Sequence, residues 1–295
     1  HLTAEESSMR KFNSKGRVRL GVAMAGLLAL TWSTSSAALV VQADMLELYK
    51  NGSLLYRDNF DNGLTPSQEP GIYSVFGSFP AGAEAGGKLT IDSARGGFST
   101  NALGLLRQTV NVVGLTSMNG ADPTALGRND LISFSSVFDL VVPSGPLNNG
   151  YGIVLGEAGA GGVLTHSLSL QAQYISSVGQ VIRLYDQNFL TGTITVLDEV
   201  PLVAPSGADQ IAFELSNEDT KSTSFEGSYA FISSGVYGPS VTFAVTDPMF
   251  TTADVVRARL QVYSAVPEPS AWALGCIAVL ALGASRRRRP AALSA

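Results

Sequence analysis

The chain has 295 residues, of which 45% are hydrophobic and 15% charged, with 31 glycines, 13 prolines and one cysteine, Cys276. A single cysteine excludes an internal disulfide and a Cys-ligated zinc site, so stability must come from core burial. Between Asp44 and Ala265, 10 Lys plus Arg stand against 21 Asp plus Glu, a net charge of 10 − 21 = −11. So acidic a body gives no support to nucleic-acid binding and is repelled by anionic lipid surfaces.

The N-terminal part has the layout of a secretory signal peptide. Residues 1–8 precede Met9 and are set aside as an upstream extension. Residues 9–43 comprise a basic stretch, an apolar run from Leu20 to Trp32 and a small polar stretch. Cleavage after Ala37 or after Ala43 satisfies the small-residue rule equally well. The alternative, an uncleaved anchor, is less favoured because the apolar run is short for a membrane span. We therefore expect an exported protein.

The stretch "DNFDNGLTPSQE" nearly fits a twelve-residue calcium loop that begins at Asp58. Its third position is Phe60, where an oxygen ligand is required, and a strand-like sequence precedes it instead of a helix. A strand end followed by an Asn62-Gly63 turn is the simpler interpretation. A structural calcium held by Asp58, Asp61 and Asn62 stays open; no other cofactor is expected.

Period-two alternation dominates residues 44–265. In "THSLSLQAQY" one face carries His166, Leu168, Leu170, Ala172 and Tyr174. The other face carries Ser167, Ser169, Gln171 and Gln173. "DQIAFELSN" and "VVRARLQVY" alternate in the same way, the latter with Arg257, Arg259 and Gln261 on its polar side. These patterns are typical of half-buried strands.

Further candidate strands follow the same pattern and are separated by turn signals. They are "SLLYRDNF", "GKLTID", "LISFSSVFDL", "YGIVLG", "QVIRLYDQN", "GTITVLDE", "SYAFISS" and "SVTFAV", with turns at Asn62-Gly63, Asn119-Gly120 and Asn149-Gly150. About a dozen short strands exceed one flat sheet and predict an all-β fold, a two-sheet antiparallel β-sandwich over residues 44–265. The glycine-rich stretch from Gly156 to His166 is expected to be a loop between two strands that could pair.

Aromatic residues on a sandwich face can stack on sugar rings. The candidates are Tyr151, Tyr185 and Tyr237, with Asp186, Gln187 and Asn188 as hydrogen-bonding neighbours. The simpler interpretation is that these tyrosines are strand residues with their rings partly in the core.

Catalysis has little support in the sequence. Glu214, Glu218 and Asp219 offer the paired carboxylates of a glycosidase, but Glu214 alternates against apolar residues and so faces solvent, and the other two are adjacent in a loop. His166 is the only histidine between Asp44 and Ala265, which excludes a multi-histidine metal site there. The sequence therefore predicts a protein that is not an enzyme, with glycoside hydrolysis as the third alternative.

The C-terminal part combines three features in order. Pro267, Glu268 and Pro269 interrupt any helix, and the run from Ala271 to Ala284 has no polar face, which argues against a core helix. At about 1.5 Å per residue this run covers about 21 Å, less than a hydrocarbon core of about 30 Å. Trp272 can sit at one interface and Arg286, Arg287, Arg288 and Arg289 at the cytoplasmic one, which puts the body outside.

The stretch "VPEPSAWALGCIAVLALGASRRRR" resembles a PEP-CTERM sorting domain, which we place at residues 266–290. The resemblance implies a Gram-negative bacterial protein that is exported to the periplasm, held transiently in the inner membrane, and processed near Pro267 to Pro269 by an exosortase-type membrane enzyme. It further implies association with the cell surface or an extracellular polysaccharide matrix.

The body loosely resembles a concanavalin-like jelly roll, through "DNFDNG", "IRLYDQN" and "IAFELSNED" followed by "FEGSYAFI". This resemblance raises carbohydrate binding as a function. The resulting prediction is an exported surface or matrix protein with a non-enzymatic structural or adhesive role. The alternative is a carbohydrate-binding module for exopolysaccharide.

Overall fold

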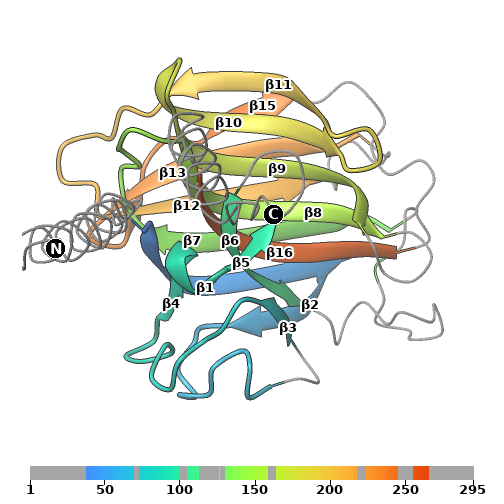
Figure 1. Cartoon of the computed structure of the whole chain (residues 1–295). Coiled ribbons are helices and arrows are strands. Elements are labelled where there is room, and N and C mark those ends of the chain that lie inside the picture. Colours follow the sequence, from blue (N-terminus) through green and yellow to red (C-terminus); the bar gives the residue numbers. More distant parts are fainter. Residues whose placement is uncertain are drawn as a thin grey trace, which may run out of the picture. The chain divides into compact units, whose positions relative to one another are not determined.

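The computed structural model describes residues 38–69, 73–99, 105–112, 126, 130–158, 164–217, 224–244 and 255–265. This part of the chain forms two antiparallel sheets, which confirms the predicted all-β fold and is consistent with a β-sandwich (Figure 1). Within these ranges no helix is long and apolar enough to cross a membrane. The predicted signal peptide and C-terminal helix lie outside the described residues.

The first sheet, sheet A, has the strand order β14-β13-β12-β7-β1-β2, with β15 beside β13 and β4 beside β1. Its strands are β1 (Val40–Lys50), β2 (Ser53–Asp58), β4 (Leu89–Asp92), β7 (Ile132–Asp139), β12 (Gln210–Ser216), β13 (Glu226–Ser233), β14 (Val236–Tyr237) and β15 (Val241–Ala244).

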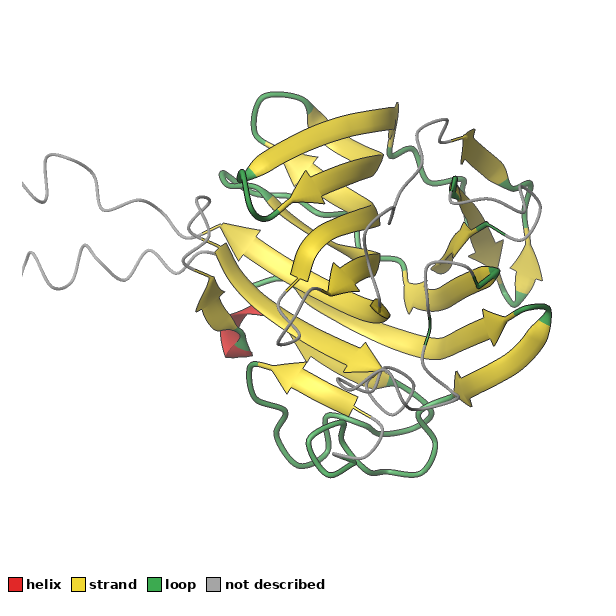
Figure 2. Cartoon of the chain, turned by 90° about the vertical axis from the view of Figure 1, so that its right-hand side faces the viewer, coloured by secondary structure: helices red, strands yellow, loops and turns green. Residues whose placement is uncertain are grey.

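The second sheet, sheet B, has the order β11-β10-β9-β8-β16-β6-β3, with β5 beside β6. Its strands are β3 (Tyr73–Phe76), β5 (Gly97–Ser99), β6 (Leu105–Val112), β8 (Asn149–Ala158), β9 (Leu164–Ile175), β10 (Gly179–Asn188), β11 (Thr193–Pro201) and β16 (Val255–Ala265). A short 3₁₀ helix, η1 (Ser93–Arg95), follows β4 and is capped by the Asp92 carboxylate, which accepts from the Ala94 backbone N–H. Figure 2 shows the strands of both sheets from the side.

One apolar cluster joins the inward faces of the two sheets. At its centre Phe138 and Phe213 of sheet A and Tyr151 of sheet B meet edge to face, with ring centroids 5.4 to 6.2 Å apart. All three side chains are at most 1% exposed. Edge-to-face contacts add to the burial term, so these rings fix one sheet against the other.

The sequence pattern predicts most of the observed strands but not all of them. The candidate strands do not include β1, β3, β5, β6 or β14, and β1 begins at Val40, ahead of the expected domain start at Asp44. The predicted turn at Asn149-Gly150 is wrong, because both residues pair with β9 at the start of β8. The expected pairing across the glycine-rich stretch after Gly156 is confirmed, since β8 and β9 are antiparallel neighbours.

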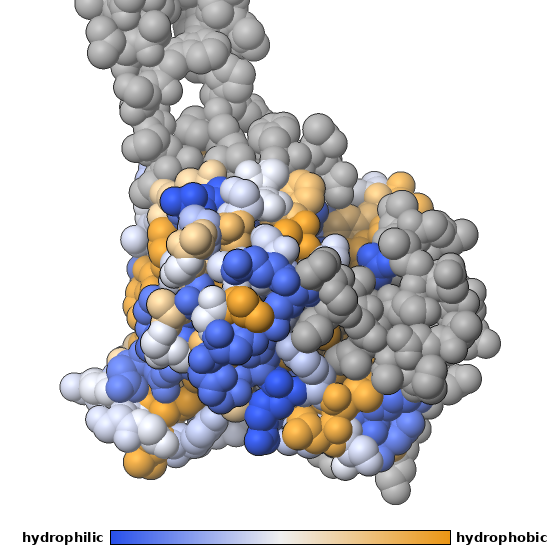
Figure 3. Space-filling model, turned by 90° about the horizontal axis from the view of Figure 1, so that it is seen from below, coloured by the Kyte–Doolittle hydropathy of each residue, from blue (hydrophilic) through white to orange (hydrophobic). Residues whose placement is uncertain are grey.

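The end of the molecule that holds the segment between β2 and β4 has a mixed surface. Seen from below, hydrophilic residues gather in its centre, with separate hydrophobic residues around them (Figure 3). Leu54 and Leu64 are among the exposed apolar side chains, at 46% and 44%. Apolar residues scattered in this way are normal for a protein surface and define no site.

Candidate functional site

The face of sheet B that points away from the core is polar. Opposite residues in an antiparallel pair share a face, so the register of β9 with β10 and β8 places Gln171 beside Arg183 and Gly152. The same rule, applied to the pairing of β16 with β8 and with β6, places alternate residues of β16 and β6 on this face as well. We call this set of outward side chains the polar face. Its members include Arg107, Thr109, Ser167, Ser169, Gln171, Gln173, Arg183, Tyr185, Arg257, Arg259, Gln261 and Tyr263.

Glycines form the middle of this face. Gly150, Gly152 and Gly156 of β8 occupy outward positions between β9 and β16. A Cβ at Gly150 would lie 3.0 Å from Cγ of Gln173 and 3.1 Å from Cε1 of Tyr263. Side chains from both neighbouring strands therefore lean over the glycines, which leave the room for them.

A hydrogen-bond network orders the amide side chains. The Tyr185 hydroxyl donates to Oε1 of Gln171 at 2.9 Å, and Nε2 of Gln173 donates to the same oxygen at 2.9 Å. The Nε2 group of Gln171 has no hydrogen-bond partner although the side chain is fully buried. On the neighbouring edge, Nε of Arg183 donates to Glu199 at 2.8 Å.

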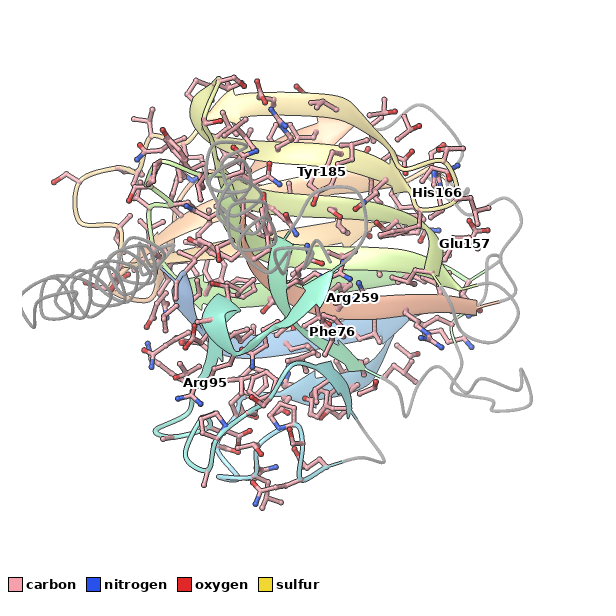
Figure 4. All side chains as sticks on the ribbon, viewed as in Figure 1. Phe76, Arg95, Glu157, His166, Tyr185 and Arg259 are labelled. Carbon is pink, nitrogen blue, oxygen red and sulfur yellow. The ribbon has the colours of Figure 1, made fainter. Side chains whose placement is uncertain are left out.

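Three further arginines lie on the same face. Arg259 is opposite Val154 and Asn111, Arg257 is two residues away along β16, and Arg107 on β6 is opposite Tyr263. Burial, together with the charges of Arg107 and Arg257, lowers the pKa of Arg259 to about 9. Burial also lowers the pKa of Arg107, whose guanidinium lies 5.5 Å from the ring centroid of Phe76. Figure 4 labels Tyr185, Arg259 and Phe76 along this side of the sheet.

Most of the polar face is buried in this structure, while Arg107, Arg183 and Arg257 are partly exposed. Gln171 is 0% exposed, Tyr185 and Arg259 are each 7% exposed, and Ser169 is 2% exposed. Burial raises the pKa of Tyr185 and of Tyr263, which keeps both hydroxyls protonated. Polar groups buried so completely are expected to be fully hydrogen-bonded, so each partner missing here calls for an explanation.

The structure separates the predicted carbohydrate-binding residues. Tyr151 is 0% exposed and points into the core, where its hydroxyl accepts from the Val141 backbone N–H at 3.2 Å, so the expectation of a sugar platform is wrong for it. Tyr185 does lie on the polar face, but its ring is buried and does not form an exposed platform.

Asp186 and Asn188 do not join Tyr185. Residues alternate along a strand, so both lie opposite residues of the other face, Leu168 and His166. Nε2 of His166 lies 2.8 Å from Oδ1 of Asp186, and its Nδ1 lies 4.0 Å from Glu157 (Figure 4). Burial raises the pKa of Asp186, and the imidazole of His166 opposes this shift. The contact of His166 with Asp186 is local and lies at the ends of β8, β9 and β10.

Tyr237 belongs to sheet A and is 56% exposed. It lines an open groove of about 470 Å³. The other lining residues are mostly apolar: Val203, Pro205, Tyr229, Phe231, Ser233, Val236, Gly238, Pro239 and Val241. Because its lining is mostly apolar, the groove offers a sugar few hydrogen-bonding groups.

The predicted calcium ligands are engaged by protein donors. The buried Asp58 carboxylate accepts from Tyr73, from Tyr56 at 3.2 Å and from the Phe60 backbone N–H at 2.7 Å. Asp61 accepts from the Asn59 side chain at 2.8 Å, and the side-chain Oδ1 of Asn62 accepts from the Leu64 backbone N–H at 2.7 Å. Among the described residues no group of three or more His, Cys, Asp or Glu side chains is placed to hold a metal ion.

The predicted carboxylate set is only partly described. Glu214 accepts from the Ser133 hydroxyl at 2.7 Å, on the outward side of sheet A. Glu218 and Asp219 lie outside the described residues, as do the sorting residues Pro267, Glu268, Pro269 and Trp272 and the arginines 286–289.

Sequence reasoning placed the polar sides of β9 and β16 correctly but treated them as solvent-facing. The missed signal is the spacing of Gly150, Gly152 and Gly156 in a strand whose neighbours carry glutamines and arginines. Glycines at alternate positions mark one face of a strand where other groups approach the backbone closely.

Comparisons with known proteins add little. No family model matches this sequence, and no curated protein matches it. Among solved structures, the chain is similar to the CBM2 module of Lactobacillus casei BL23 phage J-1 evolved Dit, at 11% sequence identity and a TM-score of 0.36. The match covers 76% of this chain and 89% of that chain. The function has therefore to be inferred from this chain's own residues.

Proposed function

We propose that the β-sandwich is a non-catalytic polysaccharide-binding domain of an exported cell-surface or matrix protein, and that the polar face of sheet B binds the polysaccharide. The observation that carries the proposal is the composition of this face. Amide, hydroxyl and guanidinium groups and two tyrosine rings surround a central strand in which three outward positions are glycine.

The chemistry of this face suits a sugar. A saccharide presents hydroxyl groups that both donate and accept, and amide and phenol side chains do the same. Gln171, Gln173 and Tyr185 already form such a network, which holds the donor on Gln171 in one orientation. Rigid polar groups that keep one orientation lose little entropy when they bind. The loose resemblance to a concanavalin-like jelly roll supports the same class of ligand.

A non-enzymatic role fits the placement of the carboxylates. Hydrolysis of a glycosidic bond needs two carboxyl groups that flank the sugar bond. Glu199 is the acidic residue that strand pairing places on the polar face among the described strands of sheet B, and it is bound to Arg183. Polysaccharide attachment would be the adhesive role of a protein delivered to the surface by a signal peptide and a PEP-CTERM-type sorting signal.

Affinity for soluble polysaccharides tests the proposal. The Gln261→Leu variant removes one amide from the polar face at nearly constant volume, and Gln261 is only 7% exposed. We expect it to weaken binding by about tenfold, since a lost hydrogen bond costs about 1 to 1.5 kcal/mol. The matched control, Tyr237→Ala, removes the exposed ring of the groove on sheet A and should leave affinity unchanged.

Two outcomes would contradict the proposal. One is that neither neutral nor acidic polysaccharides bind the wild-type protein at millimolar sugar concentration. The other is that Tyr237→Ala abolishes binding while Gln261→Leu does not, which would move the site to the groove on sheet A.

A further inference from the structure

The polar face concentrates positive charge in an acidic protein. Of the 10 Lys and Arg residues between Asp44 and Ala265, Arg107, Arg183, Arg257 and Arg259 are on this one face. Arg183 is paired with Glu199. The other acidic side chains in the described strands of sheet B, such as Glu157 and Asp186, belong to the opposite face by register. A neutral sugar would not require this concentration of charge.

Buried donors on this face lack acceptors. Nε of Arg107, Nε of Arg257 and Nε2 of Gln171 are buried and have no hydrogen-bond partner. All three groups donate and none accepts. A buried donor without a partner costs free energy, and a charged one costs more than a neutral one. An oxygen-rich anion would satisfy all three.

The arginines also act on one another. Arg107, Arg257 and Arg259 come from the neighbouring strands β6 and β16 and lie on one face of the sheet. Burial lowers the pKa of Arg259, and the charges of Arg107 and Arg257 lower it further. Burial alone lowers the pKa of Arg257. Like charges held together in a poorly solvated place favour the binding of a counter-ion.

We propose that the ligand of the polar face is an anionic polysaccharide, and that Arg107, Arg257 and Arg259 bind its carboxylate or sulfate groups. This inference rests on the proposed function and narrows its ligand class. Guanidinium groups match carboxylate and sulfate oxygens with two parallel hydrogen bonds, which gives both charge and geometric selectivity.

The negative charge of the whole body does not oppose this. At physiological salt the Debye length is about 8 Å, so a charged group at the polar face responds mainly to the arginines nearest to it.

Two matched pairs of polysaccharides test the inference with the full-length chain. They are polygalacturonate against its methyl-esterified form, and dextran sulfate against dextran. We expect the acidic member to bind at least about tenfold more tightly than the neutral member in one or both pairs. Tighter binding of polygalacturonate than of its methyl ester identifies carboxylate as the recognised group. Tighter binding of dextran sulfate than of dextran identifies sulfate. The Arg107→Gln/Arg257→Gln variant should lose this preference. The control Arg57→Gln removes one charge from the exposed side of sheet A and should keep it.

The outcomes separate the two proposals. If neutral polysaccharides bind as tightly as acidic ones and the arginine variant binds like the wild type, the anionic ligand is wrong and polysaccharide binding stands. If no polysaccharide binds, both are wrong. Should the arginine variant fail to fold, the wild-type protein alone decides. Its affinity for the acidic polymer must fall steeply between 50 mM and 200 mM NaCl, and an unchanged affinity would overturn the inference.

Discussion

Tyr185 on β10 and Gln171 on β9 are joined across the two strands by a hydrogen bond of 2.9 Å from the phenol hydroxyl to Oε1. Because Gln173 donates to the same oxygen, both acceptor positions of that carbonyl are taken. The amide of Gln171 cannot turn over without breaking two bonds. Its NH₂ group is therefore held as a donor toward the polar face.

The Tyr185→Phe variant tests this relationship. We expect it to lower the free energy of unfolding by about 1 kcal/mol and to weaken polysaccharide binding severalfold, because one of the two hydrogen bonds that hold the amide of Gln171 is lost. Tyr151→Phe removes a hydroxyl that pairs with the Val141 backbone in the core. It should cost similar stability and leave binding unchanged. Urea denaturation and affinity measurements on both variants check this, and equal losses of affinity would contradict it.

The contrast between these two tyrosines also shows what the sequence could and could not predict. Alternation around Leu170 and Gln171 assigned the two sides of β9 correctly, since that period follows from backbone geometry. It could not show that the polar side is buried, because burial depends on segments distant in sequence. Adjacent residues such as Tyr185 and Asp186 looked like one site although alternation sends them to opposite faces.

β1 illustrates a second limit. Val40 to Ala43 follow directly on a signal-peptide-like segment, so their composition was interpreted as part of it. Long-range pairing with β4 and β7 makes them strand residues, and a single sequence does not display such pairing.

If the polar face binds an anion, its arginines should destabilise the folded protein when no ligand is bound. Arg107→Met keeps most of the apolar stem and removes a guanidinium whose buried Nε has no hydrogen-bond partner. We expect the free energy of unfolding of the unliganded protein to rise by about 1 kcal/mol, while affinity for acidic polysaccharide falls. Differential scanning calorimetry without ligand measures the first effect. A lower melting temperature would indicate that Arg107 stabilises the free chain.

Gly152 should not tolerate a side chain. A Cβ there would lie 2.3 Å from the Leu170 carbonyl oxygen and 2.8 Å from Cα of Gln171, and its φ is +154°. We expect Gly152→Ala to destabilise the protein by about 3 kcal/mol or more. Gly238→Ala is the control, because its nearest contact would be the Phe231 carbonyl oxygen at 3.2 Å. Equal stabilities of the two variants in urea would contradict the close packing over β8.

Glu84 provides a test of pH dependence. It is 3% exposed, its Oε1 accepts from the Gly63 backbone at 2.9 Å, and its Oε2 has no partner. Burial, and then the charge of Asp58, raise the pKa of Glu84 above its usual value of 4.5. The folded chain thus holds this proton more tightly than the unfolded chain. The ionised form costs stability above the raised pKa, and the cost disappears as the pH falls below 4.5.

We therefore expect Glu84→Gln to stabilise the protein at pH 7 by about 0.5 to 1 kcal/mol, because the amide keeps an acceptor for Gly63 without the charge. The gain should vanish near pH 4. Thermal unfolding of both proteins from pH 4 to pH 8 measures it. A gain that is independent of pH would show that ionisation of Glu84 is not its source.

If the predicted signal peptide is cleaved, the position of β1 favours cleavage after Ala37 over cleavage after Ala43. Cleavage after Ala43 would remove Val41, which is 1% exposed, and the pairing of residues 40–43 with β4. Burial of a valine side chain contributes about 1.5 to 3 kcal/mol, so this loss would be severe for a domain of marginal stability. Cleavage after Ala37 keeps the whole strand and the bond from the Leu39 backbone to the Ser93 hydroxyl at 2.9 Å.

We expect the mature protein recovered from the cell surface to begin at Ala38, and its intact mass to place the C-terminus near Pro269. An N-terminus at Asp44 would mean that the sheet forms without the first residues of β1. The C-terminal result is independent, because a mass that still includes Arg286 to Arg289 would identify the last segment as a plain anchor. A chain that begins at Ala38 and ends near Pro269 retains both β1 and β16. β1 lies between β7 and β2 in sheet A, and β16 lies between β8 and β6 in sheet B, so both sheets stay whole.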